Sequence, residues 1–181
     1  MSVRTRSGGE PSSLKICSLV RWFIFMEKDD IYFLKEAYKE ALLAFEEGEI
    51  PVGCVIAKDN EIISRGHNEK EKTKDVTRHA EIVAIQKAEQ KLDSIKLKDC
   101  TLYVTLEPCL MCSGAILHSF ISEVIFCLKD SREGAIVSKY RVFDEPSRYP
   151  RPLIRIVDDV INSEELLQRF FKKKRSNTDI E

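Results

Sequence analysis

The sequence lacks an excess of charge of either sign. Its 181 residues include 29 Lys and Arg against 30 Asp and Glu, which gives a formal net charge of -1 at pH 7. A chain balanced in this way has no global attraction for nucleic acid or any other polyanion. Such a partner would have to meet a local patch, and residues 172–175 (Lys-Lys-Lys-Arg) are the candidate. The alternative is that this run is only the solvated end of a helix.

A hydrophobic run long enough to cross a membrane is also missing. The apolar stretch at residues 16–26 is interrupted by Arg21, whereas a spanning helix needs about 20 apolar residues and a secretory signal needs an unbroken apolar core. We therefore expect no membrane partner and a cytoplasmic location. Residues 1–13 are polar, so we predict that residues 1–25 are a disordered or wrongly assigned N-terminal extension and that the domain starts at Met26.

The context for a disulfide framework is absent as well. The chain has six cysteines, but it has no convincing export signal, and a chain of this length can build a core without disulfides. Reduced thiols are the simpler interpretation. We predict that Cys109 and Cys112 are metal ligands and that the others are small buried residues or, for Cys17, part of the extension. The other three are Cys54, Cys100 and Cys127.

The pattern of apolar residues predicts a single α/β domain without internal repeats. Apolar positions at spacings of three and four indicate helices, and short runs rich in Val, Ile, Thr and Tyr indicate strands. The predicted strands are residues 50–57, 61–66, 100–106, 121–128 and 153–157, and the predicted helices begin near residues 30, 78, 108 and 162. This order predicts a three-layer αβα arrangement, in which helices cover both faces of a mixed five-stranded sheet.

The helix boundaries and one helix face can also be predicted. Asp30, Thr77 and Asn162 are the predicted N-caps, the last in a capping box with Glu165, and Pro108 suits the first position of its helix. Spacing predicts the inward face of the first helix, which comprises Ile31, Leu34, Tyr38, Leu42 and Phe45.

Two short motifs carry the chemistry of the chain. The first is His79-Ala80-Glu81 and the second, about thirty residues later, is Pro108-Cys109-Leu110-Met111-Cys112. Each is predicted at a helix N-terminus, and a spacing of three lets both sulfurs face one point, where the positive end of the helix dipole favours thiolates. One imidazole and two thiolates beside a separate carboxylate are the groups of a catalytic zinc site with a fourth position for water. We predict that His79, Cys109 and Cys112 bind zinc and that Glu81 transfers protons.

Other interpretations of these residues must be weighed. Cys-x-x-Cys alone fits a redox pair or a structural zinc site. The upstream His79-x-Glu81 and the adjacent Pro108 favour the catalytic site, because a structural zinc needs a fourth protein ligand and the sequence offers no obvious one. His67 and His118 are predicted to be structural or surface residues.

At these motifs the chain resembles the cytidine deaminase-like superfamily and, within it, is similar to the bacterial tRNA-specific adenosine deaminases. The likeness covers roughly residues 27–175. Beyond the zinc motifs it includes Pro51-Val52-Gly53, Gly66-His67-Asn68, the run at residues 101–109, Ser113-Gly114-Ala115 and Gly134-Ala135.

The resemblance implies a substrate and further site residues. It implies one Zn²⁺ per subunit, a homodimer, and conversion of the wobble adenosine of a tRNA anticodon stem-loop to inosine. It further implies a deaminase domain at residues 26–175, followed by a flexible tail at 176–181. Asn68 and Asp130 match residues that contact or lie beside the RNA, although by themselves they fit equally well the end of a strand and a turn.

The sequence departs from that pattern at several positions, and other functions compete. Val76 stands where the family usually has Pro, and Phe120 replaces a customary Arg near the substrate side. Residues 144–155 lack the Asn-His-Arg-Val motif that is usual in the family. The main alternative is a deaminase of a free base or nucleoside, such as guanine or cytosine. A second is a non-catalytic, zinc-containing nucleic-acid-binding module.

Overall fold

The structure is a computed structural model that describes residues 29–178. The extension predicted at residues 1–25 lies outside the described residues. Within residues 29–178, no helix combines the length and the apolar character that crossing a membrane requires.

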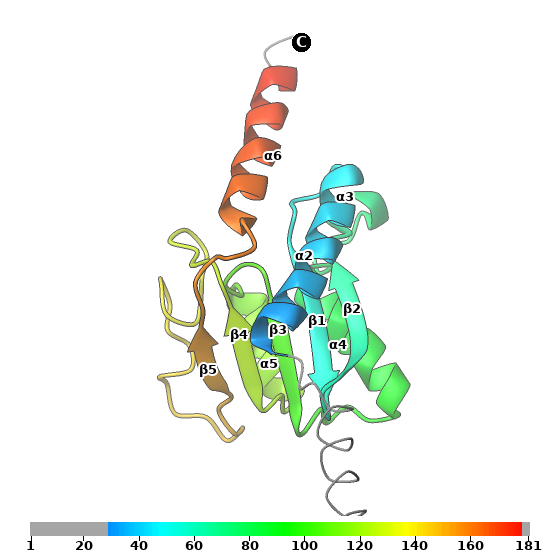
Figure 1. Ribbon diagram of the computed structural model, residues 1–181. Coiled ribbons are helices and arrows are strands. Elements are labelled where there is room, and N and C mark those ends of the chain that lie inside the picture. The colour runs from blue at the N-terminus through cyan, green and yellow to red at the C-terminus, as the bar shows by residue number, and fades with distance from the viewer. Residues whose placement is uncertain (1–28, 179–181) are drawn as a thin grey trace, which may run out of the picture.

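A five-stranded sheet lies at the centre of the domain (Figure 1). Its spatial order is β2 (Glu61–His67), β1 (Gly53–Lys58), β3 (Cys100–Val104), β4 (Glu123–Phe126) and β5 (Leu153–Ile156). β1 runs antiparallel to both of its neighbours, whereas β3, β4 and β5 are parallel. The prediction of a mixed sheet of five strands is therefore confirmed.

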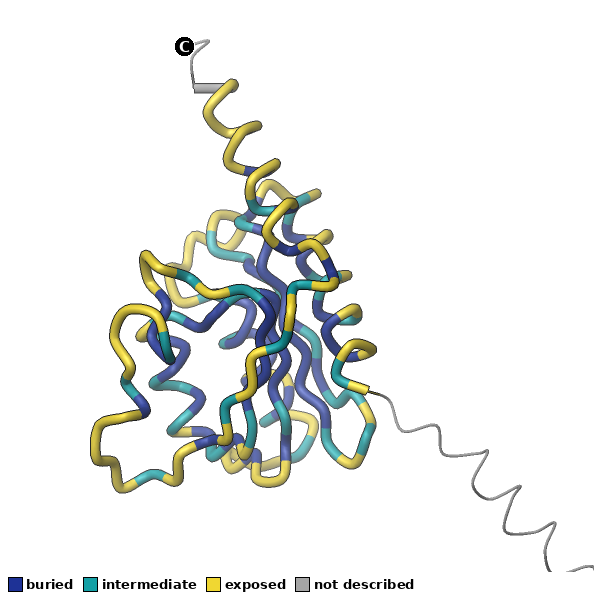
Figure 2. The backbone as a smooth tube through the Cα atoms, turned by 60° about the vertical axis from the view of Figure 1, so that its left-hand side comes forward, coloured by how far each residue is buried: buried dark blue, intermediate teal, exposed yellow. Residues whose placement is uncertain are grey.

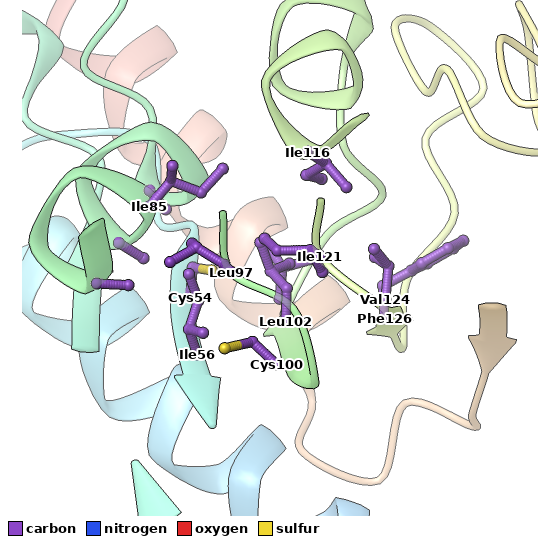
Figure 3. Packing of buried hydrophobic residues seen from close by; sticks show 14 of the residues in the cluster. Cys54, Ile56, Ile85, Leu97, Cys100, Leu102, Ile116, Ile121, Val124 and Phe126 are labelled. Carbon is purple, nitrogen blue, oxygen red and sulfur yellow. The ribbon is translucent and has the colours of Figure 1, made fainter. Parts of the chain in front are cut away.

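Helices cover both faces of this sheet. α2 (Asp30–Glu46) lies on one face, and α4 (Ala80–Leu92) and α5 (Leu110–His118) lie on the other. Because side chains alternate along a strand, Val55, Tyr103 and Ile125 pack toward α2. The residues one step along the strands form the larger core, where Cys54, Ile56, Leu102, Val124 and Phe126 meet Ile85 and Ile116 (Figure 3). The predicted three layers are present.

The inward face of α2 was predicted only in part. Leu34 is buried as predicted, and Tyr38 and Phe45 are half-buried, but Ile31 is 39% exposed and Leu42 is 37% exposed. The other buried residues of the helix are Phe33, Ala37, Ala41 and Ala44. Small alanines let the helix backbone approach the sheet closely, so the face is set by residue size as well as by the spacing of large apolar groups.

The helix caps also differ from the predictions. Asp29, not Asp30, caps α2 by accepting a hydrogen bond from Tyr32 N at 2.8 Å. At the last helix, α6 (Ser163–Thr178), Asp159 accepts hydrogen bonds from the backbone of Ser163 and Glu164, each at 2.9 Å. Asn162 has a φ of +57° and is not in a capping box. A residue three positions further upstream therefore satisfies the free N–H groups of α6.

The last helix is enclosed only near its start. α6 extends past the edge of the sheet, and most of its surface is exposed (Figure 2). It continues to Thr178, three residues beyond the predicted end of the domain at residue 175. Its inner side, with Leu166 and Phe170, is buried near its start, which leaves the later turns available to a partner.

One close backbone contact places the helix that follows β2. A Cβ atom at Gly66 would lie 2.4 Å from the carbonyl oxygen of Ala80 and 2.7 Å from the nitrogen of Ala84. Only a residue without a side chain lets β2 and the first turns of α4 approach this closely. Between them the predicted loop at residues 68–76 contains a short helix, α3 (Lys70–Thr73).

Candidate active site

His79, Cys109 and Cys112 converge at one point. The Nδ1 atom of His79 lies 3.7 Å from the sulfur of Cys109 and 3.7 Å from that of Cys112, and all three atoms lie within 4.8 Å of one another. Tetrahedral zinc with ordinary Zn–N and Zn–S bonds would separate such N and S atoms by about 3.6 Å. The three side chains therefore fit one Zn²⁺, and the structure brings together the residues that were predicted to hold it.

Two adjacent helix starts produce this geometry. His79 is the N-cap of α4 and Cys109 is the N-cap of α5, and neither side chain caps its own helix. Pro108 thus precedes the N-cap and is not the first helical residue. Thr77 is not the cap of α4 either, because its hydroxyl donates to Asp75 at 2.7 Å in the preceding turn. The side chains of His79 and Cys109 therefore do not cap their helices and can face a metal at the positive ends of the two helix dipoles.

The two thiols differ in acidity. A hydrogen bond from the Cys112 thiol, together with one from His79, lowers the pKa of Cys109 to about 4. The same hydrogen bond to Cys109 and burial raise the pKa of Cys112. Cys109 is therefore a thiolate at neutral pH, which is the form of cysteine that binds metals.

Glu81 lies in the first turn of α4, next to these thiols. Its side chain is buried, with 4% of the residue exposed. Burial and, second, the negative charge of Cys109 raise the pKa of Glu81 to about 7. A carboxyl group with this pKa both accepts and releases protons at neutral pH, as a general acid and base must.

Asn68 does more than end a strand. Its Nδ2 donates to the carbonyl oxygen of Ile50 at 3.0 Å, and its Oδ1 accepts from the backbone N–H of Ala80 at 2.9 Å. The second contact satisfies one of the free N–H groups at the start of α4. Asn68 thus fixes the helix that carries His79 and Glu81, and it also lines the cleft above them.

Asp130 shapes a turn at the edge of the same cleft. Its Oδ1 accepts from the backbone of Arg132 at 2.8 Å and of Glu133 at 3.3 Å. The residue is half-buried and lines the cleft. The turn and the place in the cleft are thus both present, and contact with the substrate stays a prediction.

Glu107 has a role that the sequence did not predict. It is only 3% exposed. Its carboxylate accepts hydrogen bonds from the backbone N–H groups of Asp130, Ile136, Val137 and Ser138 and from the Ser138 hydroxyl. Burial opposes ionisation, but the hydrogen bonds outweigh it and the pKa of Glu107 lies below its ordinary value. The only signal in the sequence is its place directly before Pro108 and Cys109.

A cleft of about 1330 Å³ opens above the metal-binding residues. His79, Glu81 and Cys109 line it, as do Leu167 and Phe170 of α6. Several cationic side chains also line it, namely Lys70, Lys129, Arg132, Lys172, Lys174 and Arg175. Three members of the basic run at residues 172–175 thus face the same cleft as the metal site.

The remaining predicted positions lie elsewhere. His67 is hydrogen-bonded to Glu40 at 2.9 Å, and His118 packs on Tyr149, as expected of structural or surface residues. Phe120 packs on Tyr149 beyond the C-terminal end of α5, the opposite end from Cys109. Phe120 therefore lies outside the lining of this chain's own cleft, and its effect on the substrate stays a prediction. Val76 is 73% exposed in the loop before His79.

Comparisons with known proteins agree with this geometry. The model of the cytidine and deoxycytidylate deaminase zinc-binding region matches residues 27–128. A tRNA-specific adenosine deaminase of Aquifex aeolicus is 48% identical over 146 residues, which are 81% of this chain and 96% of that protein. One of Streptococcus pyogenes serotype M1 is 38% identical over 156 residues, 84% and 90% of the two chains.

Solved structures extend the likeness to the fold. One comes from a study of A-to-I editing by tRNA:A34 deaminases at the wobble position of transfer RNA. It has a TM-score of 0.73 and 36% identity, covering 76% of this chain and 99% of that one. A guanine deaminase from Bacillus subtilis has a TM-score of 0.57 and 31% identity, covering 78% and 94%. The predicted fold class is confirmed.

Proposed function

The chain belongs to the cytidine and deoxycytidylate deaminase family, and from this premise we propose that it is a zinc-dependent deaminase that converts the wobble adenosine of a tRNA anticodon loop to inosine. The observation that carries the proposal is the convergence of His79, Cys109 and Cys112 beside Glu81, at a cleft that several cations also line. The proposed catalytic domain is residues 26–175, and α6 continues the fold to Thr178.

The residues divide the work of deamination between them. His79, Cys109 and Cys112 would hold one Zn²⁺, which when bound supplies Lewis-acid activation of a water molecule. Glu81 takes a proton from that water as its oxygen attacks C6 of adenine. Glu81 delivers this proton to N1. It then takes the second proton from the new C6 hydroxyl and delivers it to the amino group, so that the C6–N6 bond breaks, ammonia leaves and a carbonyl remains at C6. Water and adenosine are thereby converted to ammonia and inosine.

The size of the cleft and the cations that α6 contributes to its lining, which also contains carboxylates, support an RNA substrate. Pockets for small ligands usually have volumes of about 300–1000 Å³, whereas this cleft measures about 1330 Å³. Cations such as Lys172 and Arg175 on its outer wall suit phosphates flanking the reacting base. An unpaired anticodon loop also lets the base be extruded at little cost. Free guanine is the second candidate, favoured by the likeness to the Bacillus subtilis enzyme.

Asn68 and Asp130 are the proposed substrate-binding residues. Both amide atoms of Asn68 are already held by backbone groups, so the side chain is oriented before the substrate arrives. An amide NH₂ has two N–H groups, and the second can meet a base or ribose in the cleft. Asp130 offers a carboxylate whose orientation its own turn fixes.

A homodimer is supported by the surface of α5. This helix, LMCSGAILH, is apolar on most of its circumference, yet Leu110 is 45% exposed. A Cβ atom at Gly114 would have no neighbour within 4 Å. An apolar helix with an open side suits burial against a second copy. Gly114→Trp should shift the chain from dimer to monomer in size-exclusion chromatography with light scattering, and a dimer that persists would oppose this interface.

The cytoplasm is the proposed location. A tRNA substrate is found there, and the cysteines of the described residues, including Cys109 and Cys112, are all free thiols. A reducing compartment keeps such thiols available to a metal.

The deciding experiment compares substrates. The zinc-loaded protein should form inosine in a synthetic anticodon stem-loop with adenosine at the wobble position, and should leave free guanine, cytosine and adenosine essentially unchanged. Nucleoside analysis by mass spectrometry checks this. Turnover of a free base with an inert stem-loop would favour the second candidate, and no turnover of any substrate would overturn both.

A further inference from the structure

We propose that Glu107 is a positioning residue for the RNA. Its buried carboxylate would hold residues 129–133, here called the cleft loop, at the wall of the cleft. This inference rests on the proposed function, and it adds a residue that touches neither the substrate nor the metal.

The carboxylate of Glu107 is the centre around which the chain turns after β4. Its Oε1 accepts from Ile136, Val137 and Ser138 at 3.0, 2.8 and 3.0 Å. Its Oε2 accepts from the N–H of Asp130 at 3.1 Å. One buried anion thus collects N–H groups from both ends of the segment that includes the cleft loop, and leaving such groups without a partner is costly.

Further backbone contacts join this segment to the metal-binding strand end. Glu107 N donates to the carbonyl oxygen of Leu128 at 2.8 Å, and Ala135 N donates to that of Pro108 at 2.9 Å. Gly134 also pairs with Cys109 as an isolated β-bridge. The cleft loop and the metal-binding Cys109 are therefore parts of one assembly, so the carboxylate sets the distance from the loop to the reacting centre.

The space at Gly134 shows how closely this assembly is packed. A Cβ atom there would lie 2.5 Å from both Cδ and Oε2 of Glu107, and 2.4 Å from the carbonyl oxygen of Asp130. A methyl group at this position would have to displace the carboxylate or the loop. Gly134→Ala is thus a second, independent way to disturb the same contact.

Replacement of Glu107 by glutamine separates the two oxygens. Glutamine has the same shape but offers one oxygen and one NH₂ group. If the amide oxygen of glutamine takes the Oε1 position, the three backbone hydrogen bonds to that atom are preserved. The NH₂ group then faces the N–H of Asp130, and two donors cannot form a hydrogen bond with each other. Glu107→Gln should therefore release the Asp130 end of the loop and spare the rest.

The test measures loop and substrate separately. In Glu107→Gln the Asp130 amide should exchange its hydrogen at least tenfold faster, with zinc content and melting temperature near wild type. KM for the anticodon stem-loop should rise about tenfold, the scale of one lost buried hydrogen bond, with kcat changed less than threefold. Gly134→Ala should shift KM in the same direction. Ser138→Ala, which removes a hydroxyl from the same oxygen without touching Asp130, is the matched control and should change KM less than twofold.

A double-mutant cycle checks the route of the effect. If Glu107 acts through the cleft loop, Glu107→Gln should add little to the KM of Asp130→Ala. Additive effects, an unchanged KM, or loss of zinc in Glu107→Gln would each overturn the positioning role. The wild-type protein could be inactive on the stem-loop while Glu107→Gln still speeds hydrogen exchange at the Asp130 amide. In that case the proposed function and the inference about RNA both fail, but the role of Glu107 in holding the cleft loop is supported.

Discussion

Arg155 on β5 binds Asp30 at the start of α2, although 125 positions separate them in the sequence. Both terminal nitrogens of the guanidinium contact the Asp30 carboxylate, Nη2 at 3.0 Å from Oδ1, and Nε contacts Glu123 on β4 at 2.5 Å. The Tyr103 hydroxyl donates to the same Asp30 oxygen at 3.2 Å. One side chain therefore joins the first helix of the described residues to the last two strands of the sheet.

Arg155→Ala should lower the free energy of unfolding by about 1–2 kcal/mol, because it leaves Asp30 and Glu123 close together without their shared cation. The side chains are 20–42% exposed, so solvent limits the effect. Urea unfolding at constant zinc measures it. Arg141→Ala is the control: its ion pair with Asp144 is 3.8 Å long and two-thirds exposed, and a loss as large as that of Arg155→Ala would contradict the prediction.

Glu81→Gln should bind one zinc per chain but lose at least a hundredfold in kcat, since removing general acid–base catalysis typically costs a factor of about 10²–10⁴. Its amide keeps the size of the buried side chain, so the melting temperature should stay close to wild type. Metal analysis and inosine formation are measured on the same sample. A variant that still turns over would show that the proton transfer belongs to another group.

Cys109→Ser and Cys112→Ser should each lose zinc and activity together, because each removes one of the three ligands that the geometry brings within 4.8 Å. Chelation of wild-type protein should also lower its melting temperature, and added zinc should restore it. Cys100→Ala changes a buried thiol outside this group and should retain the metal. Full zinc occupancy in either serine variant would exclude that cysteine as a ligand.

The ion pair of His67 should make stability depend on pH. The hydrogen bond to Glu40 raises the pKa of His67 above its ordinary value of about 6.5. A raised pKa means that the folded state holds the proton more tightly, so the contribution is complete below about pH 6.5 and is lost as pH rises through the folded-state pKa. The free energy of unfolding of the wild type should exceed that of His67→Gln by about 1 kcal/mol or more at pH 6. The difference should be smaller at pH 9.

Urea unfolding of both proteins from pH 6 to 9, with zinc in excess, provides this difference. His118→Gln is the matched control, because that ring is exposed and packs on Tyr149 instead of binding a carboxylate. A difference between wild type and His67→Gln that grows with pH would contradict the assigned direction.

Neutralising residues 172–175 should weaken binding of the stem-loop and flatten its salt dependence, because each lost phosphate contact reduces the slope of log K against log salt by about 0.7–0.9. Three of these four residues line the cleft, whereas Lys173 lies over the ring of Phe45. Lys173→Gln alone should therefore have the smallest effect. Titrations at several salt concentrations check this, and unchanged affinity would mean that the run is only a solvated helix end.

The metal site and the sheet could be predicted from the sequence because their signals are local. The spacing in His79-x-Glu81 and Cys109-x-x-Cys112 reports residues within one helical turn, and the short, nearly continuous apolar runs at residues 53–58 and 100–104 report buried strands. Two helix starts at one edge of a sheet then have few ways to be arranged.

The errors arose where the outcome depends on packing between distant segments. Ala37 and Ala41 face the sheet because close backbone approach favours small residues there, which a search for large apolar residues does not detect. Asp159, and not Asn162, caps α6, because the turn before the helix brings the Asp159 carboxylate to the backbone N–H groups of the first helical turn. Glu107 collects N–H groups from up to 31 positions away, and no short motif indicates that contact.

The absence of a side chain at Gly66 has a practical consequence for anyone who wishes to retarget this enzyme. Tolerance to replacement at that position is limited by backbone spacing, since even one methyl group would force a shift of the backbone at Ala80, which directly follows His79. A randomised library should therefore vary the rim of the cleft and keep residue 66 constant. Variants altered there would be discarded for failing to load metal before their choice of base could be read.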